Sequence, residues 1–238
     1  MSSKEDIIKK IKSKGHWLIN IHPEIYIGQK VEKRNLKEII QKATVNLSGW
    51  SYPYFLHRVD EPYPTLNGIE TCIDSDFRLE FWRITQSANF LQLLAIKEDW
   101  IEYSDYDNIW SRGDELKGKK LLGVFNTLFT LTEIFEFAKR LTTQNIFDET
   151  VIIDIKLNDL NNRMLFVDSR ERVPFSLPQM SHVDNWIWKK PYSATEFLKN
   201  SSQYALDAFQ DLVFLFSWEQ PPIDSLRNEQ EKFLQGKI

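Results

Sequence analysis

The segment that decides the fold is residues 69–96, which read IETCIDSDFRLEFWRITQSANFLQLLAI. Its short apolar and β-branched runs predict three successive strands, at Ile69–Ile73, Phe77–Thr85 and Asn89–Ile96. The tripeptide Gln86-Ser-Ala88 can turn the last two strands into a hairpin. Strands linked in this way indicate the centre of an antiparallel or mixed sheet.

Further strands are predicted on both sides of this segment. Alternating Trp17, Ile19 and Ile21 mark residues 16–22 as a strand. We also expect a hairpin that joins two strands across the turn 158–162. The remaining predicted strands are Thr44–Leu47, Leu121–Phe129, Val151–Leu157 and Met164–Val167 (the two arms of that hairpin), and Val183–Lys189.

Apolar residues spaced three and four apart predict the helices that cover this sheet. The capping boxes Thr130–Glu133 and Ser193–Glu196 precede the two longest, which run to Leu141 and to about Ser217. Shorter helices are expected at 3–13 and 34–43, a last amphipathic turn or two at 224–235, and a long surface connection at 98–119. The expected fold is therefore α+β, with a mostly antiparallel or mixed sheet covered by helices.

Composition sets the limits on function. The chain has 238 residues, 42% of them hydrophobic and 13% aromatic, which is enough for a sizeable core. We expect a single domain that spans residues 1–238. Alternatively, residues 1–15 form an N-terminal appendage to that domain. The net charge of −4 provides no overall basic field for nucleic acid. The single Cys72 excludes a disulfide framework and a site made of several cysteines. No signal peptide or membrane-spanning run is visible, so we expect a cytoplasmic protein that does not enter a membrane.

One pattern could support catalysis, namely Asp154-Ile-Lys156 on a predicted strand. An acid-x-Lys pair on a strand is the core of a metal-dependent nuclease signature, and strand alternation puts both side chains on one face. The acid could hold Mg²⁺ while the lysine stabilises the developing phosphate charge. A further acid such as Glu80 would have to complete the site. The alternative interpretation is a solvated strand face paired with its neighbour.

Other chemistries find no support. Only 8 residues are glycine, and no glycine cluster forms a phosphate-binding loop. His16 and His22 would lie about 20 Å apart along one strand, at roughly 3.3 Å per residue. His57 and His182 have no partner at ligand spacing. We therefore expect no metal site and no cofactor.

Aromatic residues indicate two candidate binding surfaces. Trp186 and Trp188 would point the same way from one strand, next to Lys189 and Lys190, and could stack on bases or a peptide. Core packing against a helix is the alternative for these two rings. The second surface is the loop 49–55, in which Trp50, Tyr52 and Tyr54 are the candidate binding residues.

Three segments resemble a known family. They are Ala43-Thr-Val-Asn-Leu-Ser-Gly-Trp-Ser-Tyr-Pro53, then Glu80-Phe-Trp-Arg83 with Asn89-Phe-Leu-Gln92, and Leu131-Thr-Glu-Ile-Phe-Glu-Phe-Ala138. Together they resemble the region found C-terminal to Schlafen-type, Alba-like DNA-binding domains in bacterial proteins. The resemblance covers roughly residues 35–217. It implies an accessory or sensing role in prokaryotic regulation or defence, and the lack of the Alba-like domain in this chain puts DNA binding in doubt.

The leading hypothesis is a non-enzymatic interaction or sensor domain that acts with a protein partner or as a homo-oligomer. Its candidate surfaces are the loop Trp50–Phe55 and the end of the C-terminal helix near Trp218. One alternative is a metal-dependent nuclease or phosphoesterase centred on Asp154 and Lys156. The other is a nucleic-acid-binding module that uses the tryptophans and lysines at 186–190.

Overall fold

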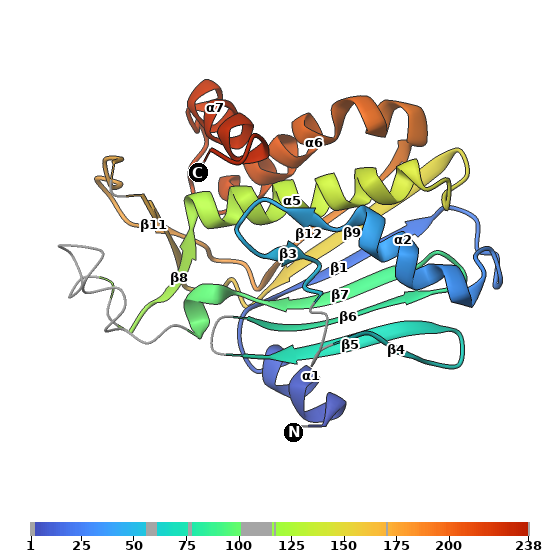
Figure 1. Ribbon diagram of the computed structural model, residues 1–238. Coiled ribbons are helices and arrows are strands. Elements are labelled where there is room, and N and C mark those ends of the chain that lie inside the picture. The colour runs from blue at the N-terminus through green and yellow to red at the C-terminus, as the bar shows by residue number, and fades with distance from the viewer. Residues whose placement is uncertain are drawn as a thin grey trace.

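The computed structural model describes residues 3–55, 61–75, 78–100, 116, 118–169 and 171–237. Its main element is a seven-stranded sheet in the order β12-β9-β1-β7-β6-β5-β4, and every neighbouring pair runs antiparallel (Figure 1). The predicted α+β class is confirmed. The strands of this sheet are β1 (His16–Pro23), β4 (Tyr63–Pro64), β5 (Gly68–Asp74), β6 (Leu79–Thr85), β7 (Phe90–Ala95), β9 (Thr150–Asn158) and β12 (Asn185–Ser193).

The main core lies on the face of the sheet that three helices cover (Figure 1). On β6, Trp82 and Ile84 point into this core, as strand alternation requires. Phe90 of β7 packs against Phe137 of the central helix, with ring centroids 4.7 Å apart. The helices on this inner face are α2 (Leu36–Ala43), α5 (Val124–Thr143) and α6 (Ala194–Phe214), with the 3₁₀ turn η1 (Lys33–Asn35) before α2.

A smaller core lies on the opposite, outer face. Helix α1 (Lys4–Lys12) places Ile7 and Ile11 on Phe81 and Leu93, so it covers β5, β6 and β7. Figure 1 shows α1 beneath that half of the sheet. Leu18 of β1 packs against the edge of this outer core.

The last helix, α7 (Ile223–Leu234), is longer than the turn or two expected there. It packs on α5 through Phe233, whose ring stacks on Phe129 at 4.2 Å. Gln230 is buried between the helices and donates a hydrogen bond to the Thr132 hydroxyl at 3.1 Å. Of the two helices for which the sequence predicts a capping box, α6 begins at Ala194 as expected. The Ser193 side chain nevertheless makes no capping hydrogen bond.

The predicted strand Leu121–Phe129 is wrong beyond Gly123. Strand β8 covers Lys120–Gly123, and α5 begins at Val124, so the expected capping box at Thr130 lies inside the helix. Two distant carboxylates cap the helix instead. Asp168 accepts hydrogen bonds from the N–H groups of Phe125 and Asn126 at 2.7 and 2.8 Å, and Glu98 accepts one from Gly123 at 2.8 Å. These partners are remote in sequence, so no local pattern could indicate this start.

The predicted hairpin across residues 158–162 is also wrong. Both edges of β9 are already paired, with β1 on one side and β12 on the other. The chain turns away through Asp159 and Asn162, both with positive φ. Strand β10 (Arg163–Phe166) then joins a second sheet, where it pairs parallel with β8 and antiparallel with β11 (Gln179–Met180).

Some predictions fall outside the described residues. They are His57, the start of the strand expected at Phe77, and most of the connection 98–119. At the beginning of that connection the structure describes the 3₁₀ turn η2 (Lys97–Asp99). Among the described helices, none combines the length and apolar character needed to cross a membrane.

Candidate functional site

Asp154 and Lys156 lie on the outer face of the sheet, as their alternation predicts. Their neighbours Ile153 and Ile155 point into the main core. The Asp154 carboxylate forms a 3.0 Å ion pair with Lys189 of β12. The ion pair between Asp154 and Lys189 thus has the geometry of a cross-strand contact on a partly exposed face.

Glu80 does not join these two residues. It lies on β6 and points to the inner face with Trp82, whereas Asp154 points outward from β9. Strands β1 and β7 separate β6 from β9, a gap of about 14 Å at the usual strand spacing. Within the part of the chain that the structure describes, no three His, Cys, Asp or Glu side chains gather in a way that could hold a metal ion.

Trp186 and Trp188 are buried under α6. Trp186 donates a hydrogen bond from its indole N–H to Asp211 of α6 at 2.7 Å, and its ring lies edge-on to Trp17 at 6.4 Å. Lys190 covers the other ring, with Nζ 3.6 Å from the Trp188 centroid. Lys189 and Lys190 are exposed, but the two indoles present no open face of the kind that stacks on bases.

The aromatic loop is a small hairpin, which we call the aromatic hairpin and define as residues 45–55. It contains β2 (Val45–Asn46) and β3 (Ser51–Tyr52), joined by the tip 47–50. Its aromatic rings divide between core and surface. Tyr52 and Tyr54 are buried, whereas the Trp50 side chain at the tip is 50% exposed.

Buried polar groups hold the hairpin from below. The Tyr52 hydroxyl donates to the Gln92 side-chain oxygen, and the Tyr54 N–H donates to Glu80 at 3.2 Å. The Trp82 indole N–H donates to the Tyr54 carbonyl at 2.9 Å. Each of these bonds links the hairpin to β6 or β7, so the fold of the sheet determines where the tip lies.

At the centre of this network lies an ion pair between Arg78 and Glu80. The guanidinium Nε donates to Glu80, whose other oxygen accepts from Gln92 at 2.7 Å. The rings of Tyr52 and Tyr54 both lie within 6 Å of the guanidinium carbon, at 5.9 and 5.8 Å. Burial alone would lower the pKa of Arg78, but the charge and hydrogen bond of Glu80, with smaller contributions from Glu133 and Tyr52, more than offset this, so the pKa is raised.

Glu133 of α5 supplies a second buried carboxyl group to this region. Burial raises its pKa above the ordinary value, and the charge of Glu80 acts in the same direction. Polar contacts with Ser48 of the hairpin and the charge of Arg78 offset part of that rise. We call Tyr52, Arg78, Glu80, Gln92 and Glu133 the buried polar cluster. Burial, followed by the charge of Glu80, also raises the pKa of Tyr52 far above its usual range.

The structure therefore brings Glu80 to the predicted loop residues, and not to Asp154. Arg78, Gln92 and Glu133 were not recognised from the sequence. A signal for two cluster residues was present, because Glu80 and Gln92 occupy the same strand phase as the apolar residues Trp82 and Phe90. A polar residue at a core-facing position requires a buried partner.

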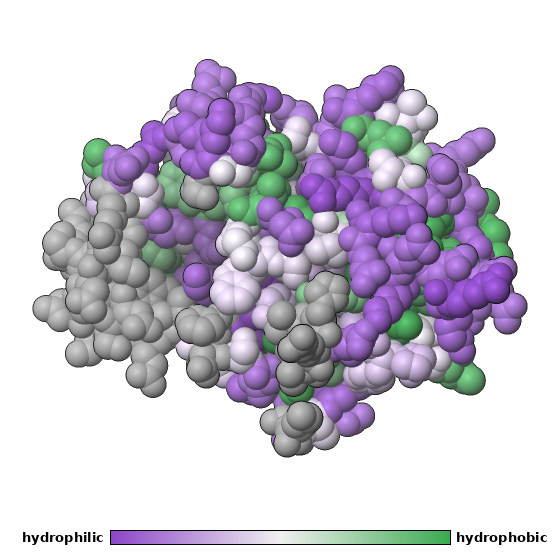
Figure 2. Space-filling view, viewed as in Figure 1, coloured by the Kyte–Doolittle hydropathy of each residue, from purple (hydrophilic) through white to green (hydrophobic). Residues whose placement is uncertain are grey.

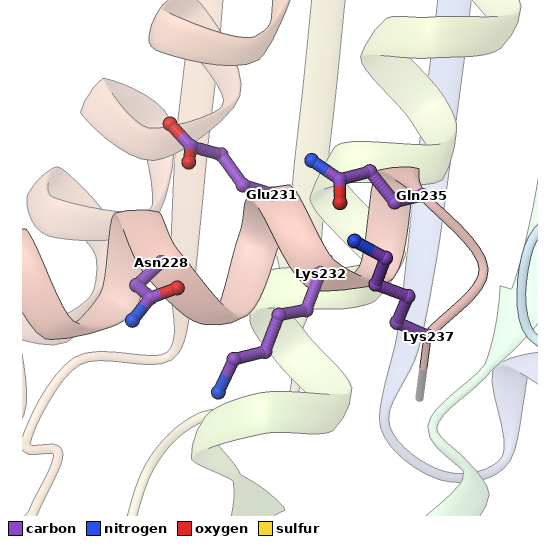
Figure 3. A pocket seen from close by; sticks show the side chains of 5 residues that line it. All are labelled: Asn228, Glu231, Lys232, Gln235 and Lys237. Carbon is purple, nitrogen blue, oxygen red and sulfur yellow. The ribbon is translucent and has the colours of Figure 1, made fainter.

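A separate hollow of about 530 Å³ lies beside α7 (Figure 3). Its side chains spread outward from the helix and do not converge on a point (Figure 3). One of them, Lys232, is already paired with Glu229 at 2.9 Å. The hollow lacks the apolar walls and convergent polar groups of a ligand site. Its lining residues are Asn228, Glu231, Lys232, Gln235 and Lys237.

Glu133→Gln is expected to gain stability relative to the natural chain as the pH rises. Because the folded-state pKa of Glu133 is raised, the stability that its protonated form contributes is present below the unfolded-state pKa and is lost as the pH rises through the folded-state value. Glutamine does not titrate. The unfolding free energies of both proteins, measured in urea between about pH 4 and pH 8, should therefore diverge in favour of the variant.

Glu38→Gln is the matched control, with the opposite sign. The hydrogen bond and charge of Lys42 lower the pKa of Glu38, so this variant should lose stability relative to the natural chain only as the pH rises to the unfolded-state pKa of about 4.3, and the difference should stay constant above it. A difference between Glu133→Gln and the natural chain that stays constant with pH would contradict the assignment of Glu133 as a buried, titrating group.

The chain was compared with protein-family models, with curated proteins and with solved structures, and none of the three comparisons gave a match.

Proposed function

We propose that this chain is a non-enzymatic interaction domain that binds a protein partner through Trp50 of the aromatic hairpin. The observation that supports it is the contrast within one hairpin. The Trp50 side chain is half exposed, while Tyr52 and Tyr54 are buried two and four residues later. Tryptophan is enriched among the residues that dominate binding energy at protein interfaces.

The support beneath Trp50 is suited to such a role. Tyr54 is tied to Glu80 and to the Trp82 indole, and the Trp50 ring lies against the Tyr54 ring at 6.0 Å. A side chain held in place before binding loses less conformational freedom when a partner engages it. The hairpin therefore presents its exposed indole in an ordered position.

The surroundings of the hairpin define the chemistry of the partner. Figure 2 shows that this face is largely hydrophilic over α2, α6 and α7, with apolar and intermediate side chains gathered between α7 and the hairpin. An apolar centre within a polar rim is the usual anatomy of a protein–protein interface. The expected partner presents an apolar pocket for the indole, surrounded by polar groups.

Two observations weigh against the other functions considered. The Asp154 carboxylate is engaged by Lys189, and Glu80 points to the other face of the sheet, so the nuclease hypothesis finds no convergent acid among the described residues. The nucleic-acid hypothesis depended on Trp186 and Trp188, which are core residues. The cytoplasmic setting and the role in prokaryotic regulation or defence rest on the sequence and its resemblance, and they remain part of this proposal.

Trp50→Ala is expected to weaken partner binding at least 30-fold. This corresponds to about 2 kcal/mol, the size of loss that defines a dominant interface residue. The partner would first be captured from the native host with the tagged chain and identified by mass spectrometry. The dissociation constant of the purified pair would then be measured by calorimetry for both forms of the chain.

Tyr26→Ala is the matched control, because Tyr26 is also an exposed aromatic residue but lies in the loop after β1. It should bind the partner as tightly as the natural chain does. Equal affinities for the natural chain and Trp50→Ala, with both proteins folded by circular dichroism, would refute the proposed surface.

A further inference from the structure

Strand β12 forms one edge of the main sheet, and β4 forms the other (Figure 1). One side of β12 is paired with β9 over its whole length, from Asn185 to Ser193. Among the described strands, none pairs with its other side. Such an edge carries a row of N–H and C=O groups to which another chain can add a strand.

The backbone groups on the free side of β12 belong to its odd-numbered residues. The N–H of Ala194, directly after the strand, donates to the Glu149 carbonyl at 2.8 Å. The carbonyl of Asp184, directly before the strand, accepts from the Leu160 N–H at 2.9 Å. Even-numbered residues at both ends of β12 thus bond on the side of β9. Because backbone groups alternate along a strand, the odd-numbered residues of 185–193 point theirs to the free edge.

The side chains along this edge are partly apolar and exposed. Residues of odd number lie on the outer face, opposite to the buried Trp186 and Trp188. Ile187 is 59% exposed, and Pro191 is exposed as well. Val183, two residues before the strand, is 38% exposed. The edge therefore combines free backbone hydrogen-bonding groups with exposed apolar side chains.

We infer that β12 pairs with β12 of a second copy of this chain, antiparallel about a twofold axis at Ile187. In a twofold interface, when one residue faces a second residue, the second also faces the first. With the axis at Ile187, this side chain meets its own copy. Lys189 comes opposite Asn185, and Pro191 comes opposite Val183. Apolar residues thus meet apolar residues, and no two like charges face each other.

The charges along the edge favour this register. Lys190 comes opposite Asp184 of the second copy, and both side chains are exposed in the single chain. The twofold axis forms this pair of opposite charges twice. An axis two residues further along, at Lys189, would instead place Lys189 opposite its own copy. Like charges directly opposite each other destabilise a strand pair, so the register about Ile187 is preferred.

Lysine and proline on an edge strand also serve in proteins to keep the edge unpaired. Two observations weigh against that interpretation for β12. Lys189 already forms a 3.0 Å ion pair with Asp154, so its charge is balanced within its own chain. Pro191 lies four residues from the axis, opposite a residue that precedes the strand, so its missing N–H removes no bond from the centre of the pairing.

Analytical ultracentrifugation tests the dimer, with the natural chain at concentrations from about 1 to about 100 μM. We expect a particle of twice the mass of one chain at the upper end. Ile187→Lys, which places two like charges on the axis, is expected to weaken dimerisation at least tenfold. Leu66→Lys is the matched control, because Leu66 is 94% exposed but lies between β4 and β5 at the other edge of the sheet. It should dimerise like the natural chain, and a natural chain that stays monomeric throughout overturns the inference.

Amide hydrogen exchange locates the contact and uses the natural chain, so it decides the question even if Ile187→Lys does not fold. In the monomer, the N–H groups of Trp186 and Trp188 are protected by β9, whereas those of Ile187 and Lys189 exchange quickly. The latter two are expected to become protected as the concentration rises. A dimer in which they stay unprotected refutes the pairing of β12.

The dimer and the proposed partner site use different surfaces, so they fail separately. Trp50→Ala is expected to leave the dimer unchanged while it weakens partner binding. Loss of the dimer in a folded Trp50→Ala protein would assign the contact between copies to the aromatic hairpin and would overturn the assignment to β12.

Discussion

Glu80→Ala is expected to lower the free energy of unfolding by about 3–5 kcal/mol, the loss typical of removing one partner from a buried ion pair. The Arg78 charge would remain buried without its counter-ion. The Tyr54 N–H and the Gln92 amide would lose their acceptor as well. Urea unfolding followed by tryptophan fluorescence measures this change, and Trp82 beside the cluster makes that signal sensitive to it.

Two further variants separate charge from shape. Glu80→Gln keeps an acceptor oxygen for Tyr54 but removes the charge, so its loss should be smaller than that of Glu80→Ala. The double variant Arg78→Met with Glu80→Leu removes both charges and should also be less destabilised than Glu80→Ala, because no unpaired ion is left. A loss below about 1 kcal/mol for Glu80→Ala would mean that the pair is hydrated and not buried.

Arg163→Ala is expected to cost a similar amount, about 3–5 kcal/mol. The Arg163 side chain is fully buried where the second sheet meets η2. It donates to both oxygens of Asp99 at 2.8 Å, and to the carbonyl groups of Leu121 and Asp159 at 2.7 and 3.0 Å. Removing it leaves the Asp99 carboxylate with only the Gly15 N–H as a donor, and it removes the donor to two carbonyl groups, one of them on β8.

Arg172→Ala is the control for this prediction. Arg172 also pairs with a carboxylate, Glu229 at 2.5 Å, but its side chain is 40% exposed, so the loss should stay below about 1 kcal/mol. Thermal unfolding of the two variants beside the natural chain measures the difference. Equal losses would show that Arg163 does not hold the second sheet in place.

The sequence determined the parts of the fold that depend on local periodicity. The strands around residues 69–96 and at 16–22 were predicted because one face of each strand meets a core, and the alternation of apolar residues records that face. The long helix from residue 194 was predicted for the same reason at helical spacing. The outward position of Asp154 and Lys156 also follows from alternation alone.

The sequence predicted the structure less well where one pattern of apolar residues is compatible with two kinds of element or with two environments. Residues 121–129 are apolar enough for a buried strand, and helix α5 takes most of them because Asp168 and Glu98 bind its first N–H groups. The tryptophans at 186 and 188 share a face as predicted, but only the position of α6 makes that face the core.

Only the tertiary structure decided which strands pair and which polar residues meet. The strand 151–157 pairs with β1 and β12, and not with the next strand in the chain, because both of its edges are filled by partners distant in sequence. The aromatic hairpin, Arg78, Glu80 and Glu133 likewise converge from separate elements, and burial makes each require the others. Periodicity records which way a side chain faces. It contains no information on what lies opposite, and that is why the buried polar cluster became visible only in the folded chain.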